Sequence, residues 1–311
     1  MSIQWFPGHM HTTRKAIAKR VPDIDVVIEL LDARAPGSST SPLLAELTRG
    51  KPTLKLLNKQ DLADPELTAA WLAHFRQQVA TQALAVDANG TAVVRAVLDA
   101  CRKLAPLRGG MVKPLRLLIC GIPNVGKSTL INKLIGRRKA ATGDEPGITQ
   151  TEQQIALASD VTLFDTPGML WPRIAAEQSG MNLAAIGSIG RNAYDEEAVA
   201  LALLARLRVR YTAALRERYR IDDIDSLDDA ALLSEIGRRR GGLRAGGVVH
   251  LQKAAEAVIN DLRNGSLGGV TLETPDEVEA WQAAARLRDA VRQTSRRASR
   301  PPRVAKPAAP I

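Results

Sequence analysis

One segment of the sequence combines glycines, a lysine and hydroxyl residues at a spacing suited to holding phosphate. It reads Gly121-Ile-Pro-Asn-Val-Gly126-Lys127-Ser128-Thr129, follows the apolar run Leu115–Cys120 and precedes an apolar-periodic segment. A glycine-rich turn between a strand and a helix directs backbone N–H groups at a phosphate, and the helix N-terminus adds partial positive charge. We expect Lys127 to reach the β- and γ-phosphates and Ser128 to bind Mg²⁺. The other expected nucleotide contacts in this loop are Asn124, Val125, Gly126 and Thr129.

A second segment places a carboxylate where a strand ends. The apolar run Val161–Phe164 leads into Asp165-Thr-Pro-Gly168, downstream of the phosphate loop. We expect Asp165 to hold Mg²⁺ through water and the Gly168 N–H to contact a γ-phosphate. Between the two motifs, Thr149 lies in a polar segment rich in glycine and proline. A hydroxyl that closes on Mg²⁺ when the γ-phosphate is present would make this segment a switch, and Thr149 is the candidate.

A third motif precedes both and has the chemistry of guanine recognition. The run Thr53–Leu57 ends in Asn58-Lys59-Gln60-Asp61. A carboxylate at Asp61 can accept hydrogen bonds from the ring N–H and the exocyclic amine of guanine, and an unpaired Asp61 would reject adenine. We expect Asn58 to reach the base or to brace the loop, and the Lys59 stem to cover the ring. GTP and GDP are the predicted ligands.

These motifs need a sheet that brings the ends of several strands together. Short apolar runs alternate with helical patterns as far as residue 174, which predicts an α/β fold with a doubly wound, mainly parallel sheet. From residue 175 to 285 the pattern is helical, and residues 286–311 form a basic tail expected to be disordered. The expected strands are Val26–Leu31, Thr53–Leu57, Ala83–Val86, Leu115–Cys120, Gln154–Leu157 and Val161–Phe164. The expected helices are Pro42–Thr48, Pro65–Val79, Thr91–Leu104, Lys127–Ile135, Glu196–Tyr219, Ala230–Arg239 and Leu251–Asn264.

The order of the motifs along the chain resembles that of a known family. In most GTPases the guanine motif follows the phosphate loop, whereas here it precedes the loop. With the opening Trp5-Phe-Pro-Gly-His9-Met10, this order resembles the ribosome biogenesis GTPase A family of circularly permuted P-loop GTPases. Leu31-Asp32-Ala33-Arg34-Ala35-Pro36 and Ile236-Gly-Arg-Arg-Arg-Gly-Gly also fit that family, and the resemblance covers roughly residues 1–272. Permutation leaves each motif after a strand, at the sheet edge where doubly wound sheets bind ligands.

One motif departs from the family pattern. The second base-contacting loop of the family has Ser-Ala or a similar small pair, whereas this chain has Val86-Asp87-Ala88-Asn89. Asp87 and Ala88 are the expected counterparts. The Ala88 backbone N–H would then face guanine.

The resemblance also implies residues for hydrolysis. Met169 follows Asp165-Thr-Pro-Gly168 where many GTPases have a glutamine that orients water, so the catalytic group must come from elsewhere. The family implies His9, whose neutral imidazole could orient the water. The alternative is that His9 packs with Trp5 and Phe6 or lies on a flexible arm. The family also implies that Asn124 helps to hold K⁺, with ordinary loop hydrogen bonding as the alternative.

The net charge of +10 is concentrated at the two ends of the chain. Residues 1–22, a basic N-terminal arm, carry +4 and residues 286–311 carry +7, which leaves −1 for residues 23–285. Such ends either keep the protein soluble or neutralise the phosphates of a nucleic acid. An internal cluster near residue 240 either binds RNA or is a solvated helix end. The candidate RNA-binding residues are Arg14, Lys15, Lys19, Arg20, Arg238, Arg239, Arg240 and Arg244.

Together these features predict a GTP-hydrolysing assembly factor for the large ribosomal subunit. A GTP/GDP switch would couple hydrolysis to binding and release of the precursor particle and its rRNA. The alternatives are a GTPase of tRNA modification or other RNA handling, and a nucleotide-gated RNA scaffold. No apolar run is long enough to span a membrane, and two cysteines indicate a reducing compartment. We therefore expect a cytoplasmic protein without membrane contact, and a monomer.

Overall fold

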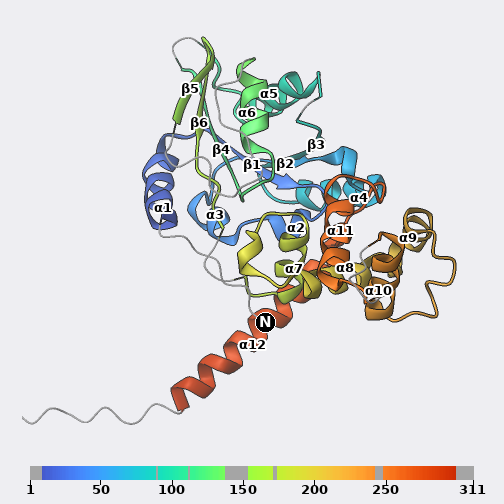
Figure 1. The fold of residues 1–311 in the computed structure, drawn as a ribbon. Helices are drawn as coiled ribbons and strands as arrows, with labels where there is room; N and C mark the ends of the chain where they lie inside the picture. The colour runs from blue at the N-terminus through green and yellow to red at the C-terminus, as the bar shows by residue number, and fades with distance from the viewer. Residues whose placement is uncertain are drawn as a thin grey trace, which may run out of the picture.

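The structure is a computed structural model. It describes residues 9–88, 90–110, 113–136, 153–170, 174–241 and 248–298, the side chains of residues 9–13, 153 and 293–298 excepted. Its centre is a six-stranded sheet in the order β3-β2-β1-β4-β6-β5. Figure 1 shows this sheet above a group of helices formed by the second half of the chain. The strands are β1 Val26–Asp32, β2 Thr53–Asn58, β3 Thr81–Val86, β4 Leu115–Gly121, β5 Gln153–Ala158 and β6 Val161–Asp165.

The sheet is parallel except at one edge, as the sequence predicts. β5 runs antiparallel to β6, and the other neighbouring strands are parallel. β1 lies in the middle and all seven of its residues are buried. Strands covered on both faces read as continuous apolar runs, which is why each predicted strand matches an observed one within one or two residues. Five of the strands end one residue later than expected, and in the four parallel ones the added residue is polar or glycine: Asp32, Asn58, Gly121 and Asp165.

Helices cover both faces of the sheet. Figure 1 shows α5 and α6 on one face, and α1 and α3 on the other. The Asp64 side chain caps α4 by accepting from the N–H groups of Glu66 and Leu67. The expected N-terminal arm is helical from residue 9, and Ile17 of that helix is buried against the core. The elements are α1 His9–Arg20, η1 Val21–Asp23, α2 Pro36–Ser39, α3 Pro42–Leu47, η2 Gln60–Leu62, α4 Pro65–Arg76, α5 Val93–Leu104 and α6 Lys127–Ile135.

The second half of the described chain is helical, as predicted, and differs in detail. The expected helix over residues 196–219 breaks at Tyr211, whose φ of −127° lies outside the helical range. The Tyr211 hydroxyl donates to Asp64 in the sheet domain at 2.9 Å, which holds the break in place. The elements are α7 Glu177–Ala185, η3 Arg191–Ala193, α8 Glu196–Arg210, α9 Thr212–Tyr219, α10 Asp229–Arg239 and α11 Leu251–Arg263.

After α11 the chain returns to the sheet. Val270 N–H donates to Leu62 at 3.0 Å, and Leu272 N–H donates to Arg34 at 2.7 Å. Glu273 is fully buried, and it accepts from Ser38 and, at 2.8 Å, from Asn182. Residues 270–273 therefore contact both halves of the molecule, and the domain boundaries at residues 174 and 285 stay predictions.

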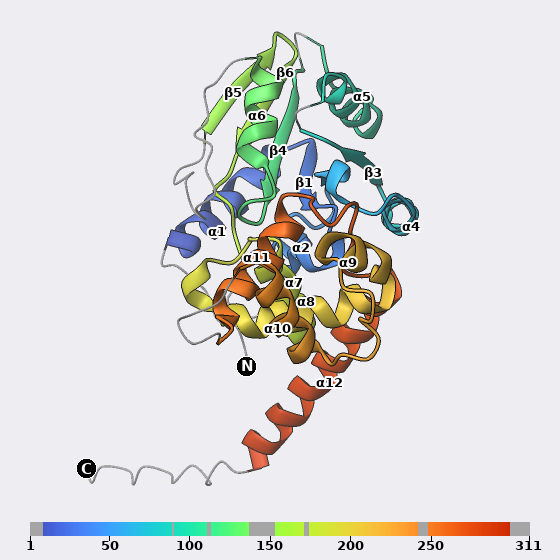
Figure 2. The ribbon, with the colours of Figure 1, turned by 45° about the vertical axis from the view of Figure 1, so that its right-hand side comes forward.

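The first part of the tail that was expected to be disordered is helical. α12 spans Pro275–Ala298 and projects from the molecule in Figure 1 and Figure 2, so residues 286–298 are helical. Arginine and alanine make up more than half of residues 286–298, and their high helix propensity outweighs the lack of apolar surface. Residues 299–311 lie outside the described residues. In the part that is described, no helix is both long and apolar enough to cross a membrane.

The two cysteines are separate, buried thiols. Cys101 and Cys120 both lie in the hydrophobic core without a disulfide. Burial raises the pKa of the Cys101 thiol to about 12, and burial also raises the pKa of Cys120. Both side chains therefore act as small apolar groups in the core.

Close packing of α2 against α4 and α12 is tested by Gly37→Ala. A methyl group at Gly37 would lie 2.5 Å from the Trp71 ring and 2.9 Å from Val278, which is closer than carbon atoms approach. Overpacking of this kind costs about 1–3 kcal/mol, so the urea unfolding midpoint should fall. In the control Gly110→Ala the methyl group meets nothing within 4 Å, and the midpoint should stay unchanged. Equal midpoints for the two variants would contradict the packing described here.

Candidate functional site

The predicted motifs meet at the carboxyl edge of the sheet. In the register of the strands, Asp32 lies opposite Asn58, Gly121 opposite Leu30 and Asp165 opposite Ile119. The ends of β1, β2, β4 and β6 thus lie side by side, and the guanine tetrad, the phosphate loop and Asp165 follow directly from them. Permutation of the chain order leaves this edge intact.

The glycines of the phosphate loop are required by its packing as well as by its expected ligand. Gly126 caps α6 with a φ of 95°, and a Cβ there would lie 2.2 Å from the Asn58 amide nitrogen. A Cβ at Gly121 would lie 2.7 Å from the Leu30 carbonyl oxygen. The loop therefore lies directly on β1 and β2, and the first turn of α6 presents its N–H groups at this edge. Ser128 and Thr129 lie in that turn, half-buried.

Lys127 and Asp165 form a buried ion pair at the foot of the loop. The Lys127 Nζ lies 3.0 Å from Asp165 Oδ1, and the two side chains are 6% and 1% exposed. Burial raises the pKa of Asp165 and outweighs the opposing effect of the Lys127 ammonium. The segment after Asp165 is tied to the loop, since Met169 N–H donates to the Gly121 carbonyl at 3.1 Å. Gly168 also lies against the loop, because a Cβ there would lie 3.2 Å from Pro123 Cα.

Asn58 braces the loop. Its Nδ2 donates to the Val125 carbonyl at 2.8 Å, and its Oδ1 accepts from the Ala88 N–H at 2.9 Å. Of the two roles expected for Asn58, the structure shows the brace. The Ala88 backbone N–H was expected to face guanine, but in the structure it donates to Asn58 Oδ1 instead. Asp87 lies beside Ala88, and Asn89 lies outside the described residues.

Lys59 links the guanine tetrad to the phosphate loop. Its backbone adopts a left-handed conformation with a φ of 61°. Its ammonium group donates to the Asn124 carbonyl at 2.8 Å and pairs with Asp32 at 3.0 Å. Asp61 follows in η2 and is exposed, so its carboxylate is open to a ligand.

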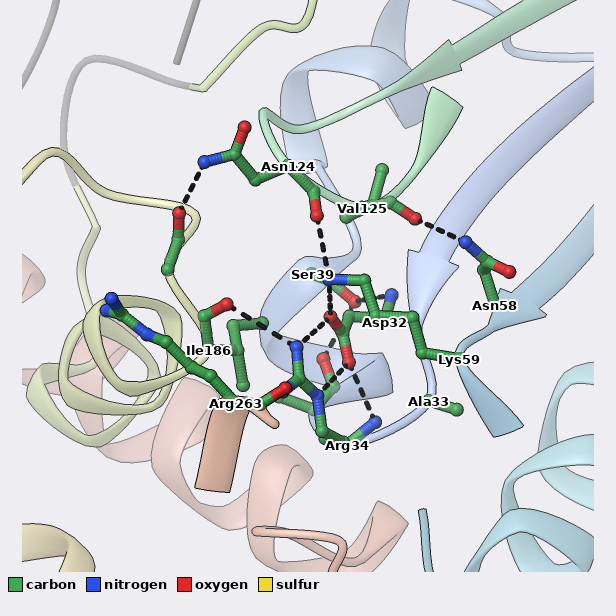
Figure 3. A network of polar contacts seen from close by, with 12 residues as sticks. Asp32, Ala33, Arg34, Ser39, Asn58, Lys59, Asn124, Val125, Ile186 and Arg263 are labelled. Carbon is green, nitrogen blue, oxygen red and sulfur yellow. Dashed lines mark hydrogen bonds and ion pairs between the residues drawn. The ribbon is translucent and has the colours of Figure 1, made fainter. Parts of the chain in front are cut away.

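Asp32 and Arg34 are the central site residues that sequence reasoning missed. The Arg34 guanidinium binds the Asp32 carboxylate through Nε at 2.9 Å and Nη2 at 2.7 Å (Figure 3). Burial would raise the pKa of Asp32, but Arg34 and Lys59 outweigh it and hold that pKa well below its usual range. The segment Leu31–Pro36 could have pointed to these two residues because it fits the family pattern, but its residue types alone do not predict a chemical role.

The residues present fit a magnesium ion that is bound together with a nucleotide. Ser128 and Asp165 offer a hydroxyl and a carboxylate, and Mg²⁺ prefers oxygen ligands, usually one or two from protein with substrate phosphates and water completing the set. A dedicated all-protein site is not expected at such a position. Among the described residues there is no group of three or more histidine, cysteine and acidic side chains able to hold a metal. Thr149, the third predicted ligand, lies outside the described residues, as does the His9 side chain.

The two groups of candidate RNA-binding residues differ. Arg14, Lys15 and Lys19 are exposed on α1, whereas Arg20 lies 4.6 Å from the centre of the Phe164 ring. Phe164 directly precedes Asp165, so the basic helix contacts the strand that ends in Asp165.

The internal arginine cluster is largely paired. Arg238 and Arg239 both bind Glu235, at 3.0 and 2.8 Å. Arg240 binds Asp261, whose pKa burial would raise but hydrogen bonds from Arg218 and Arg240 lower overall. These pairs reduce the charge available to a phosphate, and Arg244 lies outside the described residues.

With guanine tetrad, phosphate loop and strand-end aspartate in this chain order at one sheet edge, the molecule is a circularly permuted P-loop GTPase. Comparison with known proteins gives the family. Residues 116–224 match the family model described as 50S ribosome-binding GTPase. Ribosome biogenesis GTPase A of Bacillus cereus is 40% identical over 284 residues, covering 89% of this chain and 95% of the relative. The same protein of Priestia megaterium is 40% identical over 287 residues, covering 90% and 99%.

The fold has a counterpart of known structure. The crystal structure of GNP-bound YlqF from Thermotoga maritima has a TM-score of 0.59 and 25% sequence identity, and the match covers 86% of this chain and 99% of that one. The chain belongs to the ribosome biogenesis GTPase A family and is a GTPase of ribosome assembly. The predictions of fold class, family and GTP hydrolysis are confirmed.

The brace formed by Asn58 is tested by Asn58→Ala. This change leaves the buried Val125 carbonyl and Ala88 N–H without their partner, at about 1–3 kcal/mol for each group. The phosphate loop should loosen, and GDP affinity measured by calorimetry should fall by about tenfold or more. The exposed neighbour Gln60 is the control, since Gln60→Ala removes no contact of the loop. Unchanged GDP affinity in Asn58→Ala would show that the brace does not serve nucleotide binding.

Proposed function

We propose that this GTPase acts on the large ribosomal subunit during its assembly and that nucleotide state controls its residence there. The description of the matching family model, 50S ribosome-binding GTPase, supports the choice of subunit. GTP and its Mg²⁺ would engage Thr149 and the segment from Asp165 to Met169, and that form would bind the precursor particle. Hydrolysis, stimulated by that particle, would release the protein.

The observation that carries this proposal is the contact between α1 and β6. α1 presents Arg14, Lys15 and Lys19 to solvent, and its last residue, Arg20, stacks on Phe164. Asp165, the proposed magnesium residue, is next in the chain. rRNA phosphates bound by the exposed basic residues would therefore act on a helix that packs against the strand ending in Asp165. Phosphate contacts of this kind are sequence-independent and strongly salt-dependent.

Catalysis and cofactors follow from the same arrangement. Met169 is buried at 1% exposure, so it does not supply a water-orienting group. We assign that role to His9, the first residue of α1, which places it on the same helix as the basic residues. Mg²⁺ held by Ser128, Asp165 and Thr149 would neutralise charge on the phosphates. The K⁺ site at Asn124, the monomeric state and the cytoplasmic location stay predictions.

Turnover with purified ribosomal subunits tests the function. Large subunits should raise the rate of GTP hydrolysis, and the stimulation should weaken steeply as salt increases, because bound phosphates release counterions. Replacing Arg14, Lys15 and Lys19 by glutamine should reduce both the stimulation and its salt dependence, while basal turnover is retained. Stimulation by free tRNA alone would favour a GTPase of tRNA modification. Turnover that no subunit accelerates would favour an RNA scaffold.

His9→Ala tests the catalytic assignment. Loss of a water-orienting imidazole should reduce subunit-stimulated turnover by about 100-fold or more, because general acid–base groups contribute at least that much. GTP affinity should be retained, since His9 is not expected to contact the base or the loop. His11→Ala is the matched control, because it removes a histidine two residues further along the same helix. Equal stimulated rates in the two variants would refute the role of His9.

A further inference from the structure

The nucleotide site and the helices of the second half are joined through one buried polar network, the junction. Figure 3 shows it as a continuous chain of contacts from the phosphate loop to the helix ends. On the sheet side its side chains follow β1, β2 and β4. On the helical side it ends on backbone carbonyls where α7 and α11 finish. Its residues are Asp32, Arg34, Lys59, Asn124, Ile186, Gly187, Leu262 and Arg263.

Asp32 is the point where two cations meet. It is completely buried, and its carboxylate pairs with the Arg34 guanidinium at 2.7 Å and the Lys59 ammonium at 3.0 Å. A buried carboxylate without such partners would be strongly destabilising, so the positions of Arg34 and Lys59 are coupled through it. Any shift of Arg34 changes the position that Lys59 must adopt.

Arg34 carries the network into the helical half. Its remaining N–H groups point to the Ile186 carbonyl at 3.4 Å and to the carbonyls of Leu262 and Arg263 at 3.4 and 3.5 Å. Ile186 caps α7, and the other two residues end α11. The C-terminus of a helix carries partial negative charge and leaves carbonyls without intrahelical partners, so two helix ends together suit one buried guanidinium.

Asn124 forms a second, parallel connection. Its Nδ2 donates to the Gly187 carbonyl at 2.8 Å, one residue beyond the cap of α7. Its own carbonyl accepts from Lys59. The phosphate loop is thus tied to the end of α7 directly through Asn124 and indirectly through Lys59, Asp32 and Arg34.

We propose that Asp32 and Arg34 are positioning residues that couple guanine-nucleotide binding to the docking of α7 and α11. The ends of α7 and α11 hold the Arg34 side chain, and Arg34 in turn holds the Asp32 carboxylate in position. Asp32 then holds the Lys59 ammonium, so that the Lys59 stem lies where the guanine ring is expected. The proposal rests on the placement of guanine at the Asn58–Asp61 tetrad. Because binding couplings are reciprocal, nucleotide must in turn stabilise the ends of α7 and α11.

Arg34→Lys tests this coupling in the full-length protein with GDP as the probe. Lysine keeps the charge but lacks the planar fork that binds Asp32 and the helix ends at once. GDP affinity should fall by about fivefold or more, the lower end of couplings between sites. GTP affinity should fall by the same factor, because Lys59 contacts the base side and not the γ-phosphate. Wild-type GDP affinity in this variant would overturn the proposal.

Arg263→Lys is the matched control. Arg263 also joins α11 to α7, donating to the Ala184 and Ala185 carbonyls at 2.7 and 2.9 Å, but its side chain points away from Asp32 in Figure 3. Both variants remove a guanidinium from the same helix ends, and only Arg34 touches Asp32. GDP affinity should be retained in Arg263→Lys. An equal loss in both variants would show a merely structural role for the helix ends.

Hydrogen exchange of the wild-type protein gives a readout that needs no variant. GDP should slow amide exchange in the last turns of α7 and α11, although neither helix is expected to touch the nucleotide. Arg34→Lys should lose this GDP-dependent protection, and Arg263→Lys should keep it. Exchange that GDP leaves unchanged in the wild type would overturn the proposal. Ribosomal subunits are absent from these measurements, so their outcome is independent of whether subunits stimulate turnover.

Discussion

A charged carboxylate that water cannot reach determines how the rest of this molecule is arranged. Asp32 ends the central strand at 0% exposure, and its ionised form persists only because Arg34 and Lys59 both bind it. Each of these cations has further N–H groups, and buried donors also need partners. The partners of Lys59 lie in the phosphate loop and those of Arg34 lie at two helix ends. One buried charge therefore fixes the relative positions of the nucleotide site and the helical half.

Much of the sheet and of the nucleotide site could be predicted from the sequence. Strands buried on both faces give continuous apolar runs, and the motif residues follow those runs directly, so their meeting at one edge follows from the parallel topology. The charged residues inside the sheet interrupt these runs and neutralise each other, since Glu29 of β1 lies opposite Lys55 of β2 and pairs with it. The strands and the position of the motifs can be predicted from local sequence, because a polar residue or glycine follows each apolar run at the end of its strand.

Features that depend on distant partners could not be predicted. α7 contains serine, glycine and asparagine, which are poor helix formers, and it is stabilised by burial of residues such as Leu183 and by the bond from Asn182 to Glu273. Asn58 binds Val125 and Ala88 only because the fold brings the phosphate loop, which comes later in the chain, next to it. The sequence predicts that the internal arginines could bind RNA, but Arg240 pairs with Asp261 because the end of α10 packs against α11. In each case the sequence shows a residue type but not its partner.

The return of the chain at residues 270–273 has a consequence for how the protein is made. Thr271 donates to the Ala33 carbonyl across 238 positions of sequence, and Leu272 closes onto Arg34 in the same stretch. During synthesis the guanine tetrad emerges first, the phosphate loop follows, and the segment at residues 270–273 emerges after both. Contacts of such long range form late, since closing a long loop costs entropy before the contact is gained. A growing chain therefore carries its nucleotide motifs before residues 270–273 can bond to the segment that follows the central strand.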